Sequence, residues 1–293
     1  PGAPVLMHLG PGSVSLSQKS LDALKSEFGL DRSLGEQYVR YWTDLLSGNL
    51  GYSFHHHRAV GPLVGDHLAR TLAILVPAVV LSTLAAAFLG TLAGWRRESG
   101  FDLAITSLAL LGYAMPAFLT AMVFLDIFGF RLQWFPLGSF APALSASARG
   151  DLAAFGIVHH LALPVAVLSL ASAAPKLLVM RNAVSRAREE AWVLYARAKG
   201  VEPWRVALVH VFRNACLPLL HLAALHLGFV VSGAVLVEVV FSINGMGALI
   251  HEAALHRDYP VLQGVLLVLT LVVMGLNLLV DGVSSLLDPR VSP

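Results

Sequence analysis

Histidine is the residue type in this chain best suited to chemistry, because a neutral imidazole can bind a metal ion and can also transfer a proton. The stretch HEAALH, His251–His256, invites comparison with zinc proteases. Their helix carries two histidines four residues apart, which places both on one face. His251 and His256 are five residues apart. We therefore interpret this pair as surface histidines of an external hairpin.

A second group is three consecutive histidines, His55–His57. Imidazoles are good ligands for zinc and nickel. Side chains of three consecutive residues do not easily converge on one ion, so we interpret this run as an exposed loop and expect no metal site. A metal chelate as substrate would give the loop more significance.

Three further ionisable residues lie within or beside an apolar stretch, His221, His226 and Glu238. Polar groups at membrane depth usually face a bundle interior or a cavity. The histidines have two open interpretations, a translocation pathway or hydrogen bonds between helices. Glu238 is a candidate for an external gate, although we expect it to order an external hairpin rather than bind substrate.

Several kinds of site are excluded by what the sequence lacks. There is no G-x-x-x-x-G-K-[ST] segment, so the chain does not bind ATP by that loop. The single cysteine, Cys216, excludes an internal disulfide framework and a cysteine-only metal cage. A net charge of +2 is too small to indicate nucleic-acid binding. We expect no cofactor bound by this chain.

The elements that position these residues are membrane helices. The 293 residues are 56% hydrophobic and 13% charged, whereas soluble domains carry about 25% charged residues. A spanning helix needs about 20 apolar residues. The windows that qualify are Thr71–Trp95, Leu103–Leu125, Leu152–Pro175, Asn214–Val237 and Tyr259–Val280. The sequence therefore predicts an all-α polytopic membrane protein.

Lysine and arginine predict the orientation, because they accumulate in cytoplasmic loops. One side has Arg96, Arg97, Lys176, Arg181, Arg186, Arg188, Arg197, Lys199, Arg205, Arg213 and Arg290. The other side has Arg131, Arg149 and Arg257. With the first side in the cytoplasm, residues 1–70 form an external segment with short amphipathic helices, and residues 71–293 form the transmembrane domain. We expect a further helix before Pro1, which makes six spans; a natural five-span protein is the alternative.

The densest run of charge extends from Glu189 to Pro218, between two apolar blocks. Helix-forming residues lead up to Lys199, and Gly200 is placed to end that helix. A second helix is expected over Glu202–Arg213, with Pro203 in its first turn and Pro218 where the next span starts. By itself the loop is either a charged anchor at the interface or a docking surface.

The segments YARAKGV and VFRNACLP resemble the cytoplasmic loop of permeases of binding-protein-dependent ABC importers. Leu194 and Tyr195 depart from the Glu-Ala of that superfamily's general motif, as in its dipeptide/oligopeptide/nickel branch. The segments GLDRSLGEQYVRYW, GNLGYSF, GAVLVEVVFSINGMG, RDYPVLQG and NLLVDGVSSLLDPR also resemble that branch, in the correct order. The likeness is to its first permease subunit.

The resemblance implies a type I importer permease in a bacterial or archaeal cytoplasmic membrane, with a coupling loop over residues 181–215 and an external hairpin over 239–258. The implied coupling residues are Tyr195, Ala196, Arg197, Ala198, Lys199, Gly200, Arg213, Asn214 and Pro218. The implied partners are a homologous second permease, two ATPase subunits or domains that bind ATP and Mg, and an external binding protein. Peptides are the expected substrates, and nickel or a metal chelate is the alternative.

Two functions of other classes compete with this interpretation. A secondary transporter driven by an ion gradient would need ionisable groups deep in the spans, where the clearest candidates are His221 and His226. A membrane-embedded metalloenzyme lacks a convincing ligand set. Copurification with ATPase and permease partners would separate the importer from both.

Overall fold

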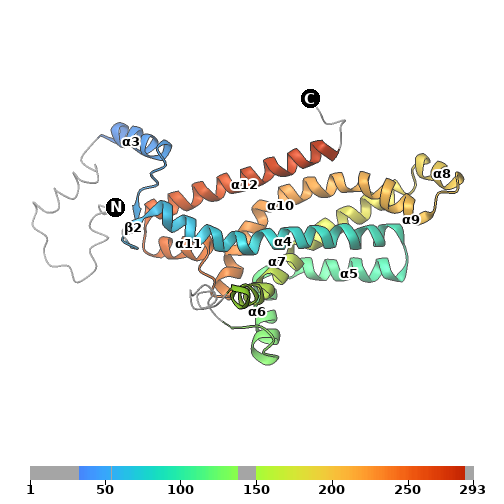
Figure 1. Ribbon diagram of the computed structural model, residues 1–293, viewed down its shortest axis with the longest axis horizontal. Coiled ribbons are helices and arrows are strands. Elements are labelled where there is room, and N and C mark those ends of the chain that lie inside the picture. Colours follow the sequence, from blue (N-terminus) through green and yellow to red (C-terminus); the bar gives the residue numbers. More distant parts are fainter. Residues whose placement is uncertain (1–32, 54, 138–149, 288–293) are drawn as a thin grey trace, which may run out of the picture. The chain divides into compact units, whose positions relative to one another are not determined.

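The computed structural model describes residues 33–53, 55–137 and 150–287, and the labels below are those of Figure 1. The first part of the segment in which we expected short amphipathic helices, residues 1–32, lies outside these residues. By its packing the chain divides into two units, the described part of Pro1–Asp66 with Leu249–Val268, and His67–Ala248 with the described part of Leu269–Pro293.

In the first unit, residues 249–268 pack with the described part of the N-terminal segment. Ser53 Oγ donates a hydrogen bond of 2.6 Å to Asp258 Oδ2. Gly264 lies very close to Val60, since a Cβ added to Gly264 would lie 2.7 Å from Val60 Cγ1. Contacts between residues 200 positions apart are not visible in local sequence patterns, so composition alone could not assign this segment.

Three short elements of the first unit follow one another along the chain. Helix α3, Leu34–Leu46, begins with a capping box in which Ser33 and Glu36 satisfy each other's backbone N–H groups. Strands β1, Tyr52–Ser53, and β2, Arg58–Ala59, form an antiparallel hairpin. The unit also contains the end of α11, Met246–Leu255, and the start of α12, Tyr259–Leu287.

The second unit is helical. Its elements are α4 (Val60–Trp95, from His67 on), α5 (Gly100–Ala114), α6 (Ala117–Phe124), the π-helical η1 (Leu125–Arg131), α7 (Gly150–Ala187), α8 (Ala191–Ala198), α9 (Pro203–Arg205), the π-helical η3 (Val206–Val211), α10 (Phe212–Val240) and the rest of α12. Helix α7 contacts α5, α6 and α10, and Figure 1 shows α7 running beside α10.

Four stretches of described helix are long and apolar enough to cross a membrane. They are Val60–Trp95, Gly156–Ala187, Pro203–Leu225 and Tyr259–Val280. Helix α5 and the α6–η1 segment pass the same test only together, which makes up to five spans if this bent pair counts as one. The five expected spans therefore all have a helical counterpart.

The expected second span, Leu103–Leu125, is not straight. The axes of α5 and of the α6–η1 segment differ by 100°. Met115, between them, is extended at φ −86° and ψ 125°. The ring of Pro116 disfavours the helical region for the residue before it, so the break falls where the sequence places this proline.

Helices α4 and α7 approach closely at two glycines of α4 in a G-x-x-x-G arrangement. A Cβ on Gly90 would lie 2.8 Å from Met180 Cβ, and one on Gly94 would lie 2.4 Å from Arg181 O. Membrane helices use small residues in this way, because backbones gain contacts when nothing separates them. Next to this crossing, Arg181 of α7 forms a bidentate ion pair with the buried Asp102 of α5, at 2.6 and 2.9 Å.

Candidate functional site: a basic helical hairpin and a buried turn

The predicted coupling loop is a helical hairpin made of α8, α9 and η3, which Figure 1 places past one end of α7 and α10. Helix α8 ends as expected at Gly200, which has a φ of +79°. The Gly200 N–H bonds to Arg197 O at 2.9 Å, and the Val201 N–H bonds to Ala196 O at 3.2 Å. These two bonds form a Schellman motif, which satisfies the last carbonyls of a helix and turns the chain sharply.

Helix α8 packs against the bundle through one fully buried side chain, Val193. It belongs to an apolar cluster with Met180, Val184, Val206, Val211, Ala215 and Leu219. Ala196 and Val201 pack against the same cluster from the two sides of the Gly200 turn. A push on α8 would therefore act directly on α7 and α10.

Polar contacts hold the start of the hairpin to the end of α4. Arg188 donates a hydrogen bond of 2.8 Å to Trp95 O, and Arg97 pairs with Glu189 at 2.9 Å. The guanidinium of Arg197 lies 5.0 Å from the centroid of the Trp95 ring. These contacts fix the orientation of the hairpin without burying its outer face.

The outer face carries large side chains that nothing in the described chain covers. Tyr195 is 63% exposed and Trp204 is 56% exposed. Trp192, Leu194, Leu208 and Val209 are also exposed. Exposed aromatic and aliphatic side chains gathered over one short hairpin suit a protein contact, and aromatic side chains beside cations also suit a helix anchored at the membrane interface.

The cations of the hairpin lie over its aromatic rings. Lys199 Nζ lies 4.4 Å from the centroid of the Tyr195 ring, and the Arg205 guanidinium lies 5.2 Å from that of Trp204. Arg205 also pairs with Glu202 at 3.3 Å. Arg197, Ala198, Lys199 and Arg213 are all exposed, so the face is both aromatic and basic.

Two residues assigned to the end of the loop lie within helix instead. Asn214 and Pro218 both belong to α10, and the amide Nδ2 of Asn214 bonds to His210 O at 3.1 Å. Pro218 lies inside helix because helix is continuous from Pro203 through η3 into α10, and its expected place at the start of the next span stays a prediction. Neighbouring helices can compensate for the N–H that a proline lacks inside a membrane helix.

The far end of α10 carries a buried turn centred on Glu238, which is 1% exposed. Thr71 Oγ1 donates to Glu238 Oε1 at 2.5 Å, and the Gly247 N–H donates to Oε2 at 2.8 Å. The Met246 N–H donates in turn to Thr71 Oγ1 at 2.8 Å. A Cβ on Gly245 would lie 2.4 Å from the carboxyl carbon, so glycine is needed for the chain to close over this carboxylate.

Of the two histidines in the fourth apolar window, the structure describes the side chain of His221 but not that of His226. His221 is exposed, and its Nδ1 lies 2.8 Å from Leu217 O of its own helix. His226 belongs to α10, but its side chain lies outside the described part. Neither the pathway nor the helix–helix interpretation is tested by these positions.

Lys176 is one of the buried ionisable residues that the sequence patterns did not reveal, together with Asp102 and Asp258. Its side chain is 0% exposed, and Nζ donates a hydrogen bond of 2.7 Å to Ser82 Oγ of α4. We had placed Lys176 near the inner end of the third span. Its position directly after Pro175 within an apolar stretch was the available signal, because charged groups at such depth usually have a function.

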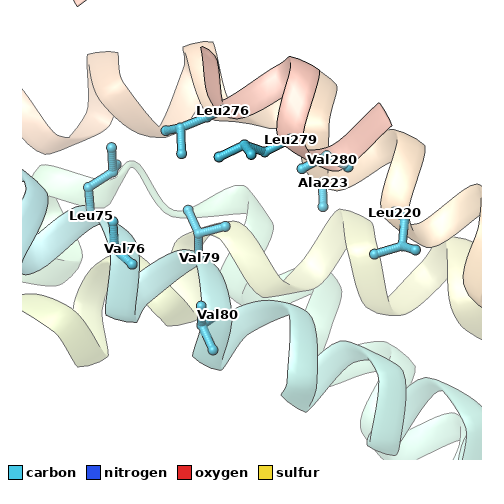
Figure 2. A pocket seen from close by; sticks show the side chains of 9 residues that line it. All are labelled: Leu75, Val76, Val79, Val80, Leu220, Ala223, Leu276, Leu279 and Val280. Carbon is cyan, nitrogen blue, oxygen red and sulfur yellow. The ribbon is translucent and has the colours of Figure 1, made fainter. Parts of the chain in front are cut away.

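A cavity of about 290 Å³ lies in the second unit among α4, α10 and α12. Figure 2 shows its lining, which is entirely aliphatic: Leu75, Val76, Val79, Val80, Leu220, Ala223, Leu276, Leu279 and Val280. A peptide backbone buried here would lose its hydrogen bonds to water without replacement, which is costly. The cavity therefore does not have the chemistry of a peptide-recognition site.

The chain is similar in sequence to known transport proteins. Residues 69–293 match the family described as binding-protein-dependent transport system inner membrane component. A putative peptide permease of Brucella suis biovar 1 is 35% identical over 99% of this chain and 90% of its own length. The di/tripeptide transport system permease DppB of Pseudomonas aeruginosa is 33% identical, also over 99% of this chain and 90% of its own length. A probable peptide ABC transporter permease of Sinorhizobium fredii is 29% identical over the same shares.

Proposed function

Since the chain belongs to the family of inner-membrane components of binding-protein-dependent transport systems, we propose that it is the permease subunit of an importer for short peptides. It is a multi-pass protein of the inner membrane and a transport subunit. Membership in this family implies, in general terms, a partner permease, ATPase subunits and a binding protein. The peptide assignment is supported by the names of relatives that align with almost the whole chain.

The observation that carries the proposal is the exposed face of the cytoplasmic hairpin around Tyr195 and Trp204. A subunit with no phosphate-binding loop of its own needs a partner to supply energy. The hairpin presents to such a partner a surface that combines aromatic rings and cations. ATP and Mg would be bound by that ATPase and not by this chain.

Movement of the ATPase would reach the membrane helices through the base of the hairpin. Val193, Ala196 and Val201 all pack into the cluster that joins α7 and α10. A shift of α8 therefore displaces the ends of two long helices together, as rigid-body rocking between inward-open and outward-open states requires. The Gly200 turn keeps α8 at a fixed angle to this cluster.

Recognition of the substrate is assigned to the separate binding protein. The cavity in the second unit is aliphatic, so it offers nothing to a peptide's charged termini. Together with the second permease, this chain would form half of the pathway. The names of the aligned relatives favour peptides over the alternative of nickel or a metal chelate.

The test is site-specific photocrosslinking in native membranes. A photoreactive phenylalanine analogue replaces Tyr195 in one variant and Leu255 in another, since both positions are well exposed. We expect the probe at 195 to capture an ATPase subunit and the probe at 255 to capture none. Capture of only lipid or of this chain itself from position 195 would reduce the hairpin to an anchor and reopen the ion-coupled alternative.

A further inference from the structure

We propose that His55, His56 and Glu252 bind a divalent transition-metal ion such as zinc. The three residues offer one ligand atom each, all within 4.8 Å of one another. His55 Nε2 lies 3.0 Å from Glu252 Oε1, and His56 Nε2 lies 3.8 Å from Glu252 Oε2. Two ligands of a tetrahedral zinc ion are about 3.3–3.5 Å apart, given bonds of about 2.0–2.2 Å, so small side-chain adjustments would admit an ion.

The site lies within the first unit and joins two segments that are distant in sequence. The histidines belong to the turn between β1 and β2, and Glu252 belongs to α11. Three consecutive histidines alone did not predict a site, because their side chains diverge. The fold supplies the third ligand from 197 residues away, and His57 is not part of the set.

The donor set indicates the class of ion. Two imidazoles and one carboxylate suit zinc, nickel or copper, whereas calcium and magnesium take oxygen ligands almost exclusively. Three protein ligands also leave a position open for water or an exogenous group. Since His55 and Glu252 are each more than a third exposed, an ion has access from solvent.

One atom in this cluster is buried and lacks a hydrogen bond. His56 Nε2 has no hydrogen-bond partner among the described residues. A buried polar atom in that state costs about 1–3 kcal/mol. A bound ion would satisfy this nitrogen, which the carboxylate 3.8 Å away does not.

The backbone and one ring of the site are held in place by further contacts. Asp258 Oδ2 accepts hydrogen bonds from Ser53 Oγ at 2.6 Å and from the His55 N–H at 3.3 Å. Ser53 Oγ accepts from the His56 N–H at 3.0 Å. The His55 ring also stacks on the His256 ring, with centroids 3.8 Å apart. Because positioned ligands lose less freedom on binding, this second layer favours metal affinity.

The experiment is a Co²⁺ titration of the purified, chelator-treated full chain, followed by visible absorption and by displacement with Zn²⁺. We expect one equivalent of Co²⁺ with a tetrahedral or five-coordinate spectrum. Affinity should fall at least about tenfold in His56→Ala and in the isosteric Glu252→Gln. His57→Ala and His251→Ala are matched controls that should leave the affinity unchanged.

Thermal unfolding provides a readout that does not depend on the spectrum. Zn²⁺ should raise the melting temperature of the unaltered chain and of His57→Ala, but not that of Glu252→Gln, because binding to the native state alone stabilises it. Equal affinity in His56→Ala and the unaltered chain would overturn the proposal. So would the lack of any stoichiometric binding, in which case His55 and Glu252 form only a hydrogen-bonded pair.

Discussion

The helical hairpin of α8, α9 and η3 and the Glu238 turn are both sharp reversals of the second unit, and they are built in opposite ways. The hairpin buries Val193 and leaves Tyr195, Trp204 and its cations exposed. The turn buries its charged group, Glu238, and satisfies it with Thr71 and backbone N–H groups. A region completed by its own contacts serves the stability of the chain, whereas the uncovered aromatic face of the hairpin is the surface that we propose an ATPase partner covers.

The largest effect on stability should come from Glu238→Ala. Thr71 Oγ1 and the Gly247 N–H would lose their acceptor, at about 1–3 kcal/mol for each buried donor. Thermal unfolding of the purified chain measures the loss. Asp126→Ala is the matched control, since Asp126 is an exposed carboxylate paired with Arg131 at 2.8 Å. Equal melting temperatures for the two variants would contradict the self-contained turn.

The next largest effect, on transport, should come from Gly200→Pro. Proline fixes φ near about −65° and has no N–H, so it can adopt neither the φ of +79° nor the bond to Arg197 O. We expect loss of peptide uptake with membrane insertion and ATP hydrolysis retained. Uptake and ATPase assays on the assembled transporter measure both.

Gly200→Asn is the matched control for that variant, because asparagine tolerates positive φ and a Cβ at this position meets nothing within 4 Å. It should retain most of the uptake. Normal uptake in Gly200→Pro would remove the turn from the coupling mechanism.

A smaller effect, on binding of the ATPase, is expected when Tyr195→Ala and Trp204→Ala are combined in one variant. Truncation of aromatic side chains at the centre of an interface often costs about 2 kcal/mol or more of binding, whereas the melting temperature of the isolated chain should hardly change. Binding of the ATPase to the reconstituted chain measures the first quantity. Trp134→Ala serves as control, as this tryptophan is 60% exposed and lies outside the hairpin. If the double variant lost much stability but bound the ATPase normally, the two aromatic side chains would serve the stability of the chain and not the binding of a partner.

The smallest effect should come from Glu202→Gln. The side chains of Glu202 and Arg205 form an ion pair of 3.3 Å, and both are exposed. Such exposed pairs contribute about 0.2–1 kcal/mol to the free energy of unfolding. We expect a change of melting temperature close to the error of the measurement, which disappears at high salt. A large destabilisation that high salt removes would show that the hairpin depends on its own charges more than on Val193.

The sequence by itself determined the features that depend on local order. Runs of apolar residues predicted the five membrane segments, and the last of them, Tyr259–Val280, begins at the first residue of α12. The end of a helix at Gly200 was also predicted correctly, because helix formers followed by glycine favour this turn regardless of the surroundings. The distribution of arginine and lysine predicted an orientation that stays a prediction.

Only the tertiary structure decided which distant residues meet. It bent the second span at Pro116, placed Lys176 against Ser82, closed the turn over Glu238 with Thr71, and brought Glu252 to His55 and His56. Helical periodicity shows which face of a helix is apolar, but it does not show which other helix covers that face. Buried polar groups are paired by contacts of this long-range kind, and for that reason the chemistry of the chain became visible only in its fold.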